Sequence, residues 1–232
     1  MFYNSVQEWF DAGMPFNSFI NGDCMEGMQA MSDKFIDLCI CDPPYGIGAG
    51  EKRKYHDNAF TSYISKKWDC NCPKAQYFDD LFRVSKNQII WGGNYFTKYL
   101  PPAKNWIVWD KKQPDGISFS MHELAFYSGD GQAKIFRGYF GGNRCTVKKI
   151  AQKYIRIHPT QKPVVLYRWL LQNYTQAGWK ILDTHVGSAS SLIACEWEGF
   201  DYIGFEIDQE YFEAACKRMD REREKMKQMK LL

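Results

Sequence analysis

The chain has 232 residues, 45% of them hydrophobic, and a formal net charge of +3 at pH 7. This length and composition can bury a full core, and we expect one domain over residues 1–232. Neither end carries the charged and then apolar pattern of a signal sequence, and no apolar stretch has the length of a membrane span, so a cytoplasmic protein without a membrane partner is expected. The eight cysteines are expected to stay reduced, and their spacing does not fit a metal site.

Strand-like and helix-like segments alternate along the chain. Strands are predicted over residues 17–22, 35–41, 87–93, 105–110, 122–128, 179–183 and 201–206. Helices are predicted over residues 24–31, 74–85, 163–175 and 188–199 and from Gln209 onward, with Pro163 at the first position of its helix. The segment 47–72 is predicted to be a polar, basic loop, and 129–157 an irregular surface insertion. This alternation predicts an α/β fold with a mostly parallel sheet.

The segment CDPPYGIG, residues 41–48, directly follows the apolar run of the second predicted strand. Two consecutive prolines cannot donate hydrogen bonds to a sheet, so the strand must end there. The break holds the Asp42 carboxylate, the Pro43 carbonyl and the Tyr45 ring in a rigid turn. Either that turn only ends the strand, or it presents two hydrogen-bond acceptors and an aromatic face to a ligand.

A second segment, ILDTHVGSASSLIACEWEGFDYIGFEID, has the pattern of a strand, a glycine-bearing loop, a helix and a further strand. Ligands of parallel α/β sheets bind at the carboxyl ends of the strands, where Asp183 and Glu206 are expected. Glu206, about twenty residues beyond the loop, is placed to accept hydrogen bonds from both hydroxyls of a ribose. Gly187 would let a ligand approach the backbone, and the helix start near Ser188 offers N–H groups. The pattern predicts a nucleoside-ligand site; the structural alternatives are a helix cap for Asp183 and a surface strand end for Glu206.

The basic residues are unevenly distributed. No acidic residue lies between Asp130 and Asp183, whereas this interval is rich in lysine and arginine. A second basic cluster follows the CDPPYGIG segment. An acid-free interval of this length indicates nucleic acid as a partner. The residues of the two regions that are predicted to contact it are Lys52, Arg53, Lys54, Tyr55, Arg137, Arg144, Lys148, Lys149 and Lys153.

Together these segments resemble the S-adenosylmethionine-dependent DNA amino-methyltransferases. The likeness rests on DPPYGIG, HPTQKP, ILDTHVGSASS and GFEID, and the segments NGDC, IIWGGNYF and NWIVWDKK extend it over most of the chain. The order of the motifs is similar to the permuted β class, which methylates adenine N6 or cytosine N4. The family's loop usually reads D-P-F-x-G-S-G-T, where this chain has Thr184, His185 and Ala189 in place of the proline, the phenylalanine and the second glycine. The resemblance implies a Rossmann-like, doubly wound sheet of seven mostly parallel strands.

The resemblance also implies roles for individual residues. The catalytic residues would be Asp42, Pro43, Pro44 and Tyr45: Asp42 and the Pro43 carbonyl accept the two amine protons, and Tyr45 stacks on the extruded base. Thr160 and Lys162 would approach the carboxylate of the cofactor, and Asp23 and Cys24 its adenine. The residues implied to bind S-adenosyl-L-methionine are Asp23, Cys24, Asp42, Thr160, Lys162, Asp183, Gly187, Ser188 and Glu206.

We therefore predict an enzyme that methylates adenine N6 in DNA, since Asp rather than Ser before Pro-Pro-Tyr favours adenine within this family. Three alternatives stay open: cytosine-N4 methylation, methylation of RNA or of a protein amide, and a non-catalytic DNA-binding subunit with the same fold. The basic segment 129–157 has the position of the family's target-recognition region and is short. This indicates a short recognition sequence, relaxed specificity or help from a second subunit, so a homodimer stays open. Restriction-modification, replication control and phage self-protection are open as biological roles.

Overall fold

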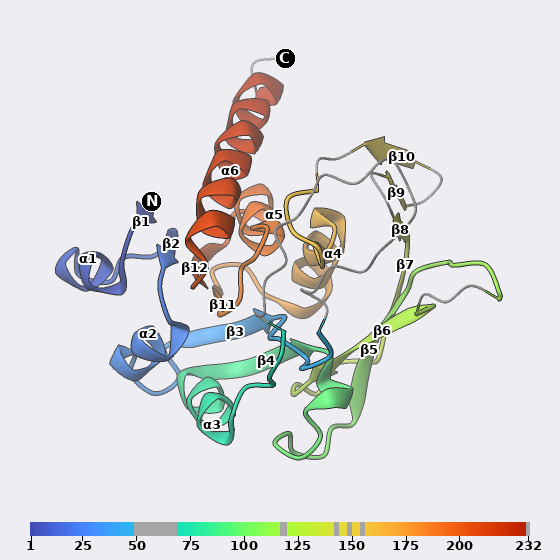
Figure 1. The fold of residues 1–232 in the computed structure, drawn as a ribbon, viewed down its shortest axis with the longest axis horizontal. Helices are drawn as coiled ribbons and strands as arrows, with labels where there is room; N and C mark the ends of the chain where they lie inside the picture. The colour runs from blue at the N-terminus through green and yellow to red at the C-terminus, as the bar shows by residue number, and fades with distance from the viewer. Residues whose placement is uncertain (49–68, 117–119, 142–143, 148–149, 154–155, 231–232) are drawn as a thin grey trace.

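The structure is a computed structural model that describes residues 1–48, 69–116, 120–141, 144–147, 150–153 and 156–230 (Figure 1). Within these residues the main sheet has nine strands in the order β1-β2-β12-β11-β3-β4-β6-β5-β7. β6 runs antiparallel to both of its neighbours, and the other neighbouring strands are parallel. The strands are β1 (Phe2–Tyr3), β2 (Ser18–Asn21), β3 (Ile36–Cys41), β4 (Ser85–Trp91), β5 (Asn105–Asp110), β6 (His122–Tyr127), β7 (Ile135–Arg137), β11 (Lys180–Asp183) and β12 (Asp201–Glu206).

The predicted α/β fold with a mostly parallel sheet is confirmed, whereas the predicted count of seven strands is wrong. The difference lies at the two edges of the sheet. β1 has two residues and β7 has three. An alternating pattern needs four or more residues to be visible in a sequence, so strands this short leave no signal.

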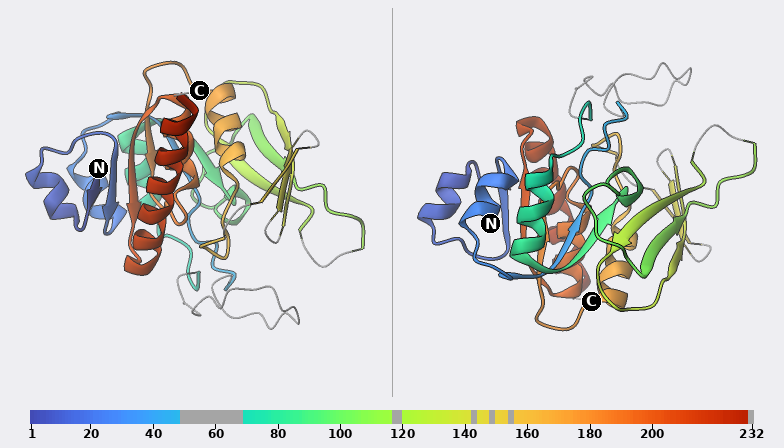
Figure 2. Two further views of the ribbon diagram at one scale, coloured as in Figure 1. Left: turned by 90° about the horizontal axis from the view of Figure 1, so that it is seen from above. Right: turned by 90° about the horizontal axis from the view of Figure 1, so that it is seen from below.

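Helices cover both faces of the sheet, and the fold therefore has three layers (Figure 1 and Figure 2). In β3, Leu38 and Ile40 pack into one hydrophobic core and Cys39 and Cys41 into the other, as expected when successive side chains point to opposite faces. Among the described helices, none has both the length and the apolar composition that a membrane span requires. One face carries α1 (Val6–Asp11), α2 (Cys24–Ala30) and α3 (Ala75–Val84), and the other carries α4 (Val164–Tyr174), α5 (Ser190–Glu198) and α6 (Gln209–Lys230).

The segment 129–157 contains regular strands, so the prediction of an irregular insertion is wrong. β7 joins the edge of the main sheet beside β5. β8 (Tyr139–Gly141), β9 (Arg144–Val147) and β10 (Ile150–Lys153) form a separate antiparallel sheet. β7 and β8 have three residues, too few for a recognisable pattern, and β9 and β10 have four, the shortest length at which alternation can be seen. The predicted loop 47–72 lies mostly outside the described residues.

Three helices begin later than the sequence predicts, and the first of them, α3, begins one residue later, at Ala75. Pro163 is the N-cap of α4, with φ −75° and ψ 142°, rather than its first helical residue. α5 begins at Ser190, because Ala189 adopts a left-handed conformation with φ 61°. Gly199 closes α5 in the left-handed conformation.

The direction of the crossovers reverses between β3 and β11, which are neighbours in the sheet. From β3 the chain passes through α3 to β4, and from β11 it passes through α5, on the opposite face, to β12. The carboxyl ends of the two strands separate at such a point, and open α/β sheets bind their ligands there. Asp42 follows β3, and Asp183 ends β11.

Candidate active site

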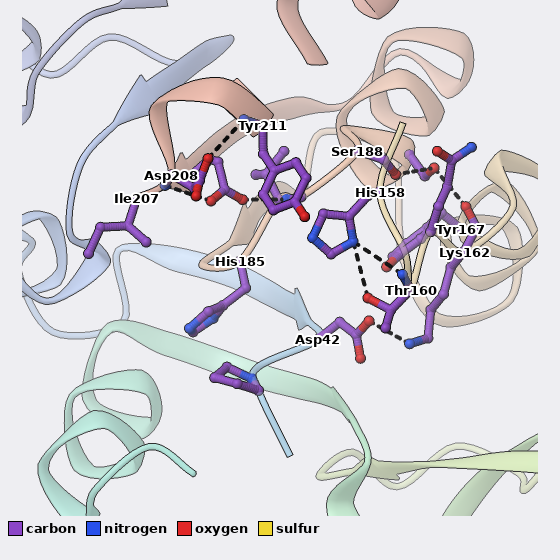
Figure 3. Close-up of a pocket in the computed structure, with 16 residues that line it drawn as sticks. Asp42, His158, Thr160, Lys162, Tyr167, His185, Ser188, Ile207, Asp208 and Tyr211 are labelled. Atoms are coloured by element: carbon purple, nitrogen blue, oxygen red, sulfur yellow. Dashed lines mark hydrogen bonds and ion pairs between the residues drawn. The ribbon is translucent and has the colours of Figure 1, made fainter. Parts of the chain in front are cut away.

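A pocket of about 320 Å³ lies at the carboxyl ends of β3, β11 and β12 (Figure 3). Figure 3 shows Asp42 and Lys162 at one end of the pocket, Ile207 and Asp208 at the other, and His158 between them. The lining residues are Asp42, Pro44, His158, Thr160, Gln161, Lys162, Tyr167, His185, Val186, Gly187, Ser188, Ser190, Glu206, Ile207, Asp208 and Tyr211.

Asp42 has a hydrogen-bond partner on each carboxylate oxygen. The Tyr45 hydroxyl donates to Oδ1 at 2.5 Å, and the Lys162 ammonium donates to Oδ2 at 2.5 Å. Burial raises the pKa of Asp42 above its ordinary value, although the Lys162 ammonium opposes this rise. A carboxylate offers about four acceptor positions, so Asp42 can accept a further hydrogen bond from a ligand.

Lys162 also contacts Glu123, a residue that no sequence pattern singled out. The Lys162 ammonium lies 3.1 Å from Glu123 Oε2, and the Lys111 ammonium lies 2.5 Å from Glu123 Oε1. Burial disfavours the ionised form of Glu123, but the Lys162 and Lys111 ammonium groups outweigh it and lower the pKa of Glu123 to about 2. One feature of the sequence could have indicated Glu123: it is an acidic residue in an alternating strand, on the same face as the buried Ala125 and Tyr127.

The Tyr45 ring is fixed by its neighbours. It stacks on the Tyr95 ring, with centroids 5.0 Å apart and planes inclined by 14°. Gly92 lies against the same ring: its φ is 67°, and a Cβ at this position would lie 2.2 Å from Tyr45 Cε1. A residue with a side chain therefore cannot replace Gly92 without moving the ring.

The backbone of the Tyr45 turn is held from outside the turn. The N–H groups of Tyr45 and Gly46 donate to Asp69 Oδ1 at 2.6 and 3.0 Å. Asp69 is 1% exposed. No sequence pattern singled it out, because a single acid in a polar segment is not distinctive.

Asp183 shapes the loop between β11 and α5. Its Oδ1 accepts a hydrogen bond from the His185 backbone N–H at 3.0 Å, and its Oδ2 accepts one from the Ser191 hydroxyl. Burial raises the pKa of Asp183 to about 7, although both hydrogen bonds oppose the rise. Asp183 is not among the described lining residues, so it acts on the shape of the loop from behind the pocket wall.

Glu206 joins the end of β12 to the same loop. Its Oε2 accepts a hydrogen bond from the Gly187 N–H at 2.8 Å, and its Oε1 accepts one from the Asp208 N–H at 2.8 Å. Gly187 adopts φ 53°. The structure thus brings six of the nine residues implied to bind the cofactor to the wall of the pocket: Asp42, Thr160, Lys162, Gly187, Ser188 and Glu206.

His185 is a half-buried part of the pocket wall. Its Nδ1 lies 2.9 Å from Thr184 Oγ1, which lies 2.7 Å from the Tyr77 hydroxyl of α3. The Tyr77 ring meets the imidazole edge to face, with centroids 5.4 Å apart. Burial lowers the pKa of His185 to about 4, so the imidazole is uncharged at neutral pH. Hydrogen bonds between His185 and Thr184 and between Thr184 and Tyr77 therefore hold the Thr184–His185 pair in place.

His158 and Thr160 also line the pocket. The Thr160 hydroxyl lies 3.1 Å from His158 Nδ1, and the His158 ring meets the Tyr211 ring edge to face with centroids 4.4 Å apart. Asp23 and Cys24 are not among the described lining residues. Asp23 caps α2 by accepting a hydrogen bond from the Met25 N–H at 2.9 Å, and Cys24 is buried.

The predicted nucleic-acid contacts are only partly described. Arg137 is exposed at the edge of the main sheet, and its Nε lies 3.7 Å from Asp110 Oδ2. Arg144 of β9 and Lys153 of β10 are opposite each other in the register of the small sheet. The predicted contacts that lie outside the described residues are Lys52, Arg53, Lys54, Tyr55, Lys148 and Lys149.

Comparisons with known proteins agree with this architecture. The Type II methyltransferase M.HpaI of Haemophilus parainfluenzae is 23% identical over 242 residues, which cover 88% of this chain and 74% of the relative. The crystal structure of the M1.HpyAVI–SAM complex has a TM-score of 0.54 and 20% identity, over 87% of this chain and 98% of that one. PvuII DNA methyltransferase (cytosine-N4-specific) has a TM-score of 0.59 and 13% identity, over 96% and 92%. These structures share the fold.

A family model extends the comparison to the residues around the site. The model of the N6_N4_Mtase family, described as DNA methylase, matches residues 63–217. This match includes β4, the segment before α4, the loop after β11 and Glu206. It spans more than half of the chain, and the protein therefore belongs to the N6_N4_Mtase family of DNA methylases.

Proposed function

We propose that this DNA methylase transfers a methyl group from S-adenosylmethionine to N6 of adenine in DNA. One observation carries the proposal: the Asp42 carboxylate lines the same pocket as Glu206. An acceptor suited to an amine and an acceptor suited to a ribose therefore share one pocket at the point where the crossovers reverse.

The pocket residues fit S-adenosylmethionine. Glu206 can bind ribose hydroxyls in addition to the two N–H groups that it holds, because a carboxylate has about four acceptor positions. Gly187 and Ser188 bring the chain close to the pocket, and the Thr160 hydroxyl lies at its wall. When bound, the cofactor supplies a methyl group on a positively charged sulfur. His185 stays neutral and so adds no positive charge against that sulfur.

Asp42 acts on the amine of the target base. It can accept one amine N–H, and the Pro43 carbonyl can accept the other. The nitrogen gains positive charge as it forms its new bond, and the ionised carboxylate stabilises that charge. The rigid turn sets both acceptors in place before the reaction, which removes an entropic part of the barrier. The proton leaves the nitrogen after transfer, with Asp42 as its nearest acceptor.

Tyr45 and Tyr95 provide the aromatic surface for a base taken out of the duplex. Their rings are stacked, and Tyr95 is 47% exposed. Stacking of a base on an aromatic side chain contributes roughly 1–3 kcal/mol. The Tyr45 hydroxyl binds Asp42, so a base on this surface lies beside the amine acceptor.

The test is the transfer of labelled methyl from S-adenosylmethionine to unmethylated DNA, followed by mass spectrometry of the nucleosides. N6-methyladenine supports the proposal. N4-methylcytosine would assign the second candidate, which the cytosine-N4 specificity of the PvuII enzyme makes the main rival. Asp42→Ala should abolish transfer while the fold persists. Wild-type activity in that variant, or no binding of S-adenosylmethionine by the wild type, would contradict the proposal, and the second result indicates a non-catalytic DNA-binding subunit.

The basic residues around β7, β9 and β10 are proposed as part of the DNA contact. Each phosphate contact releases counterions, so the affinity for DNA should fall steeply with salt. Arg137→Ala should weaken binding of all sequences alike and reduce the slope of log K against log salt by about one. An unchanged slope would exclude Arg137 from the contact.

A further inference from the structure

Two ammonium groups and two carboxylates alternate in a row that begins at Asp42 and leads away from the pocket. The Lys162 ammonium lies 2.5 Å from the Asp42 carboxylate and 3.1 Å from the Glu123 carboxylate. The Lys111 ammonium lies 2.5 Å from the other oxygen of Glu123. The side chains are 16%, 4%, 24% and 17% exposed from Asp42 to Lys111. Of the four residues, only Asp42 and Lys162 line the pocket.

The pairing of β5 with β6 fixes the positions of Glu123 and Lys111, the two residues of the row outside the pocket. Glu123 is opposite Trp109 in the register of β5 and β6, and Lys111 follows β5, where its N–H donates to the Met121 carbonyl. Aromatic faces accompany both ammonium groups: Lys162 lies 5.3 Å from the centroid of Trp91, and Lys111 lies 5.1 Å from that of Trp109. Such faces attract cations and keep water away from the pairs.

The stability of the fold does not explain this row of charges, in which Lys162 is buried and the other three side chains are partly buried. Removing charged groups from water costs free energy, and apolar side chains of similar volume often stabilise a protein as well or better. The first member of the row, Asp42, is the carboxylate that accepts the amine protons in the proposed reaction. The arrangement of the row therefore points to a role in setting the properties of that carboxylate.

We propose that Glu123 is a positioning residue, which holds the Lys162 ammonium between two carboxylates so that Lys162 does not bind Asp42 alone. This inference rests on the proposed function. The Lys162 ammonium has three N–H groups and is attracted by both carboxylates. The attraction of Glu123 weakens the pairing of Lys162 with Asp42. Asp42 then keeps enough positive charge beside it to stay ionised, and enough acceptor strength to bind the amine.

Titratable groups on several described elements act on Asp42. The Lys162 ammonium lowers the pKa of Asp42 and the Glu123 carboxylate raises it, both against a background of burial that raises it. Loss of Glu123 should therefore lower the pKa of Asp42, and loss of Lys162 should raise it. Among the described residues, the titratable groups that interact electrostatically with Asp42 include Lys162 before α4, Tyr45 in its own turn, Glu123 of β6, Tyr167 of α4 and Asp183 of β11.

The first test is the pH profile of single-turnover methyl transfer at saturating DNA and cofactor. In Glu123→Gln the acid limb should move to lower pH by roughly half a unit to one unit, with a lower plateau because Lys162 binds Asp42 alone. In Lys162→Met the limb should move to higher pH by about one to three units. Lys111→Met should also move it upward, since Glu123 then attracts Lys162 more strongly, and this variant changes no residue of the pocket.

A second test does not depend on activity. Titration of the Asp42 carboxyl carbon by ¹³C NMR in the DNA-free protein, assigned with Asp42→Asn, should show the same downward and upward shifts. If these shifts appear while the wild type methylates no DNA, the proposed function fails and the charge coupling stands.

The matched control is Glu198→Gln, which removes the carboxylate of an ion pair with Arg168. The two charged groups are 2.5 Å apart, and the Glu198 side chain is 16% exposed, similar to the residues of the row. This variant should leave the acid limb and the Asp42 titration unchanged. An unshifted Asp42 in Glu123→Gln, or shifts of the same sign in Glu123→Gln and Lys111→Met, would overturn the inference.

Discussion

The Glu206 carboxylate accepts a hydrogen bond from the Gly187 N–H at 2.8 Å and so ties the end of β12 to the loop after β11. Glu206→Gln replaces one carboxylate oxygen with an NH₂ group, which repels one of the two backbone N–H groups that Glu206 binds. Loss of a hydrogen bond to a charged group costs about 1.5–3 kcal/mol. Calorimetric titration should therefore show roughly ten- to hundredfold weaker binding of S-adenosylmethionine.

Glu213→Gln is the control, because Glu213 is exposed on α6 and contacts Gln209. It should bind S-adenosylmethionine as the wild type does. Unchanged affinity in Glu206→Gln would remove Glu206 from the cofactor site.

Gly92→Ala should reduce methyl transfer, because the new Cβ would lie 2.2 Å from the Tyr45 ring and displace it from its stack on Tyr95. Gly178→Ala is the matched control. Its φ of 80° is close to the 67° of Gly92, and a Cβ there meets nothing within 4 Å. Both variants should lose about 1 kcal/mol of stability to the left-handed backbone. Only Gly92→Ala should lose activity in the transfer assay; equal activities would show that the position of the Tyr45 ring does not matter.

The ends of the central strands could be predicted from the sequence because local rules determine them. Consecutive prolines end β3 at Cys41, just before Asp42, and the apolar run before Glu206 ends β12 at an acid. The partners of these residues could not be predicted, because they come from distant parts of the chain. Lys162 and Asp42 are 120 positions apart, and Asp69 holds Tyr45 from 24 positions away. A single sequence contains no signal for such pairs.

Asp69→Ala should slow transfer more than it lowers stability. The variant leaves the Tyr45 and Gly46 N–H groups without the carboxylate oxygen that both of them bind, so the turn that carries Tyr45 loses its anchor. Asp69→Asn keeps one carbonyl acceptor and should retain more activity than Asp69→Ala. The measurement is the single-turnover rate beside the midpoint of thermal unfolding. Asp79→Ala, an exposed position on α3, is the control, and equal rates in the control and in Asp69→Ala would contradict the anchoring role.

His185→Phe should make the protein less sensitive to acid. Burial lowers the pKa of His185 from 6.5 to about 4, so between these values the unfolded chain binds a proton that the folded chain does not. This contribution to stability is complete above pH 6.5 and is lost as the pH falls to 4. At about 1.4 kcal/mol per pH unit, the loss is about 3 kcal/mol for the wild type and is absent in the variant.

Asp183 acts in the opposite direction, since burial raises its pKa to about 7 and the folded chain then binds the extra proton. Stability from Asp183 is therefore present at low pH and falls as the pH rises from 4 to 7. Wild type and His185→Phe share this contribution, so it cancels in their difference. Urea unfolding at pH 7 and at pH 4 should show that the wild type loses about 3 kcal/mol more than the variant. Equal losses would mean that the His185 imidazole takes up a proton in the folded protein as readily as in the unfolded chain.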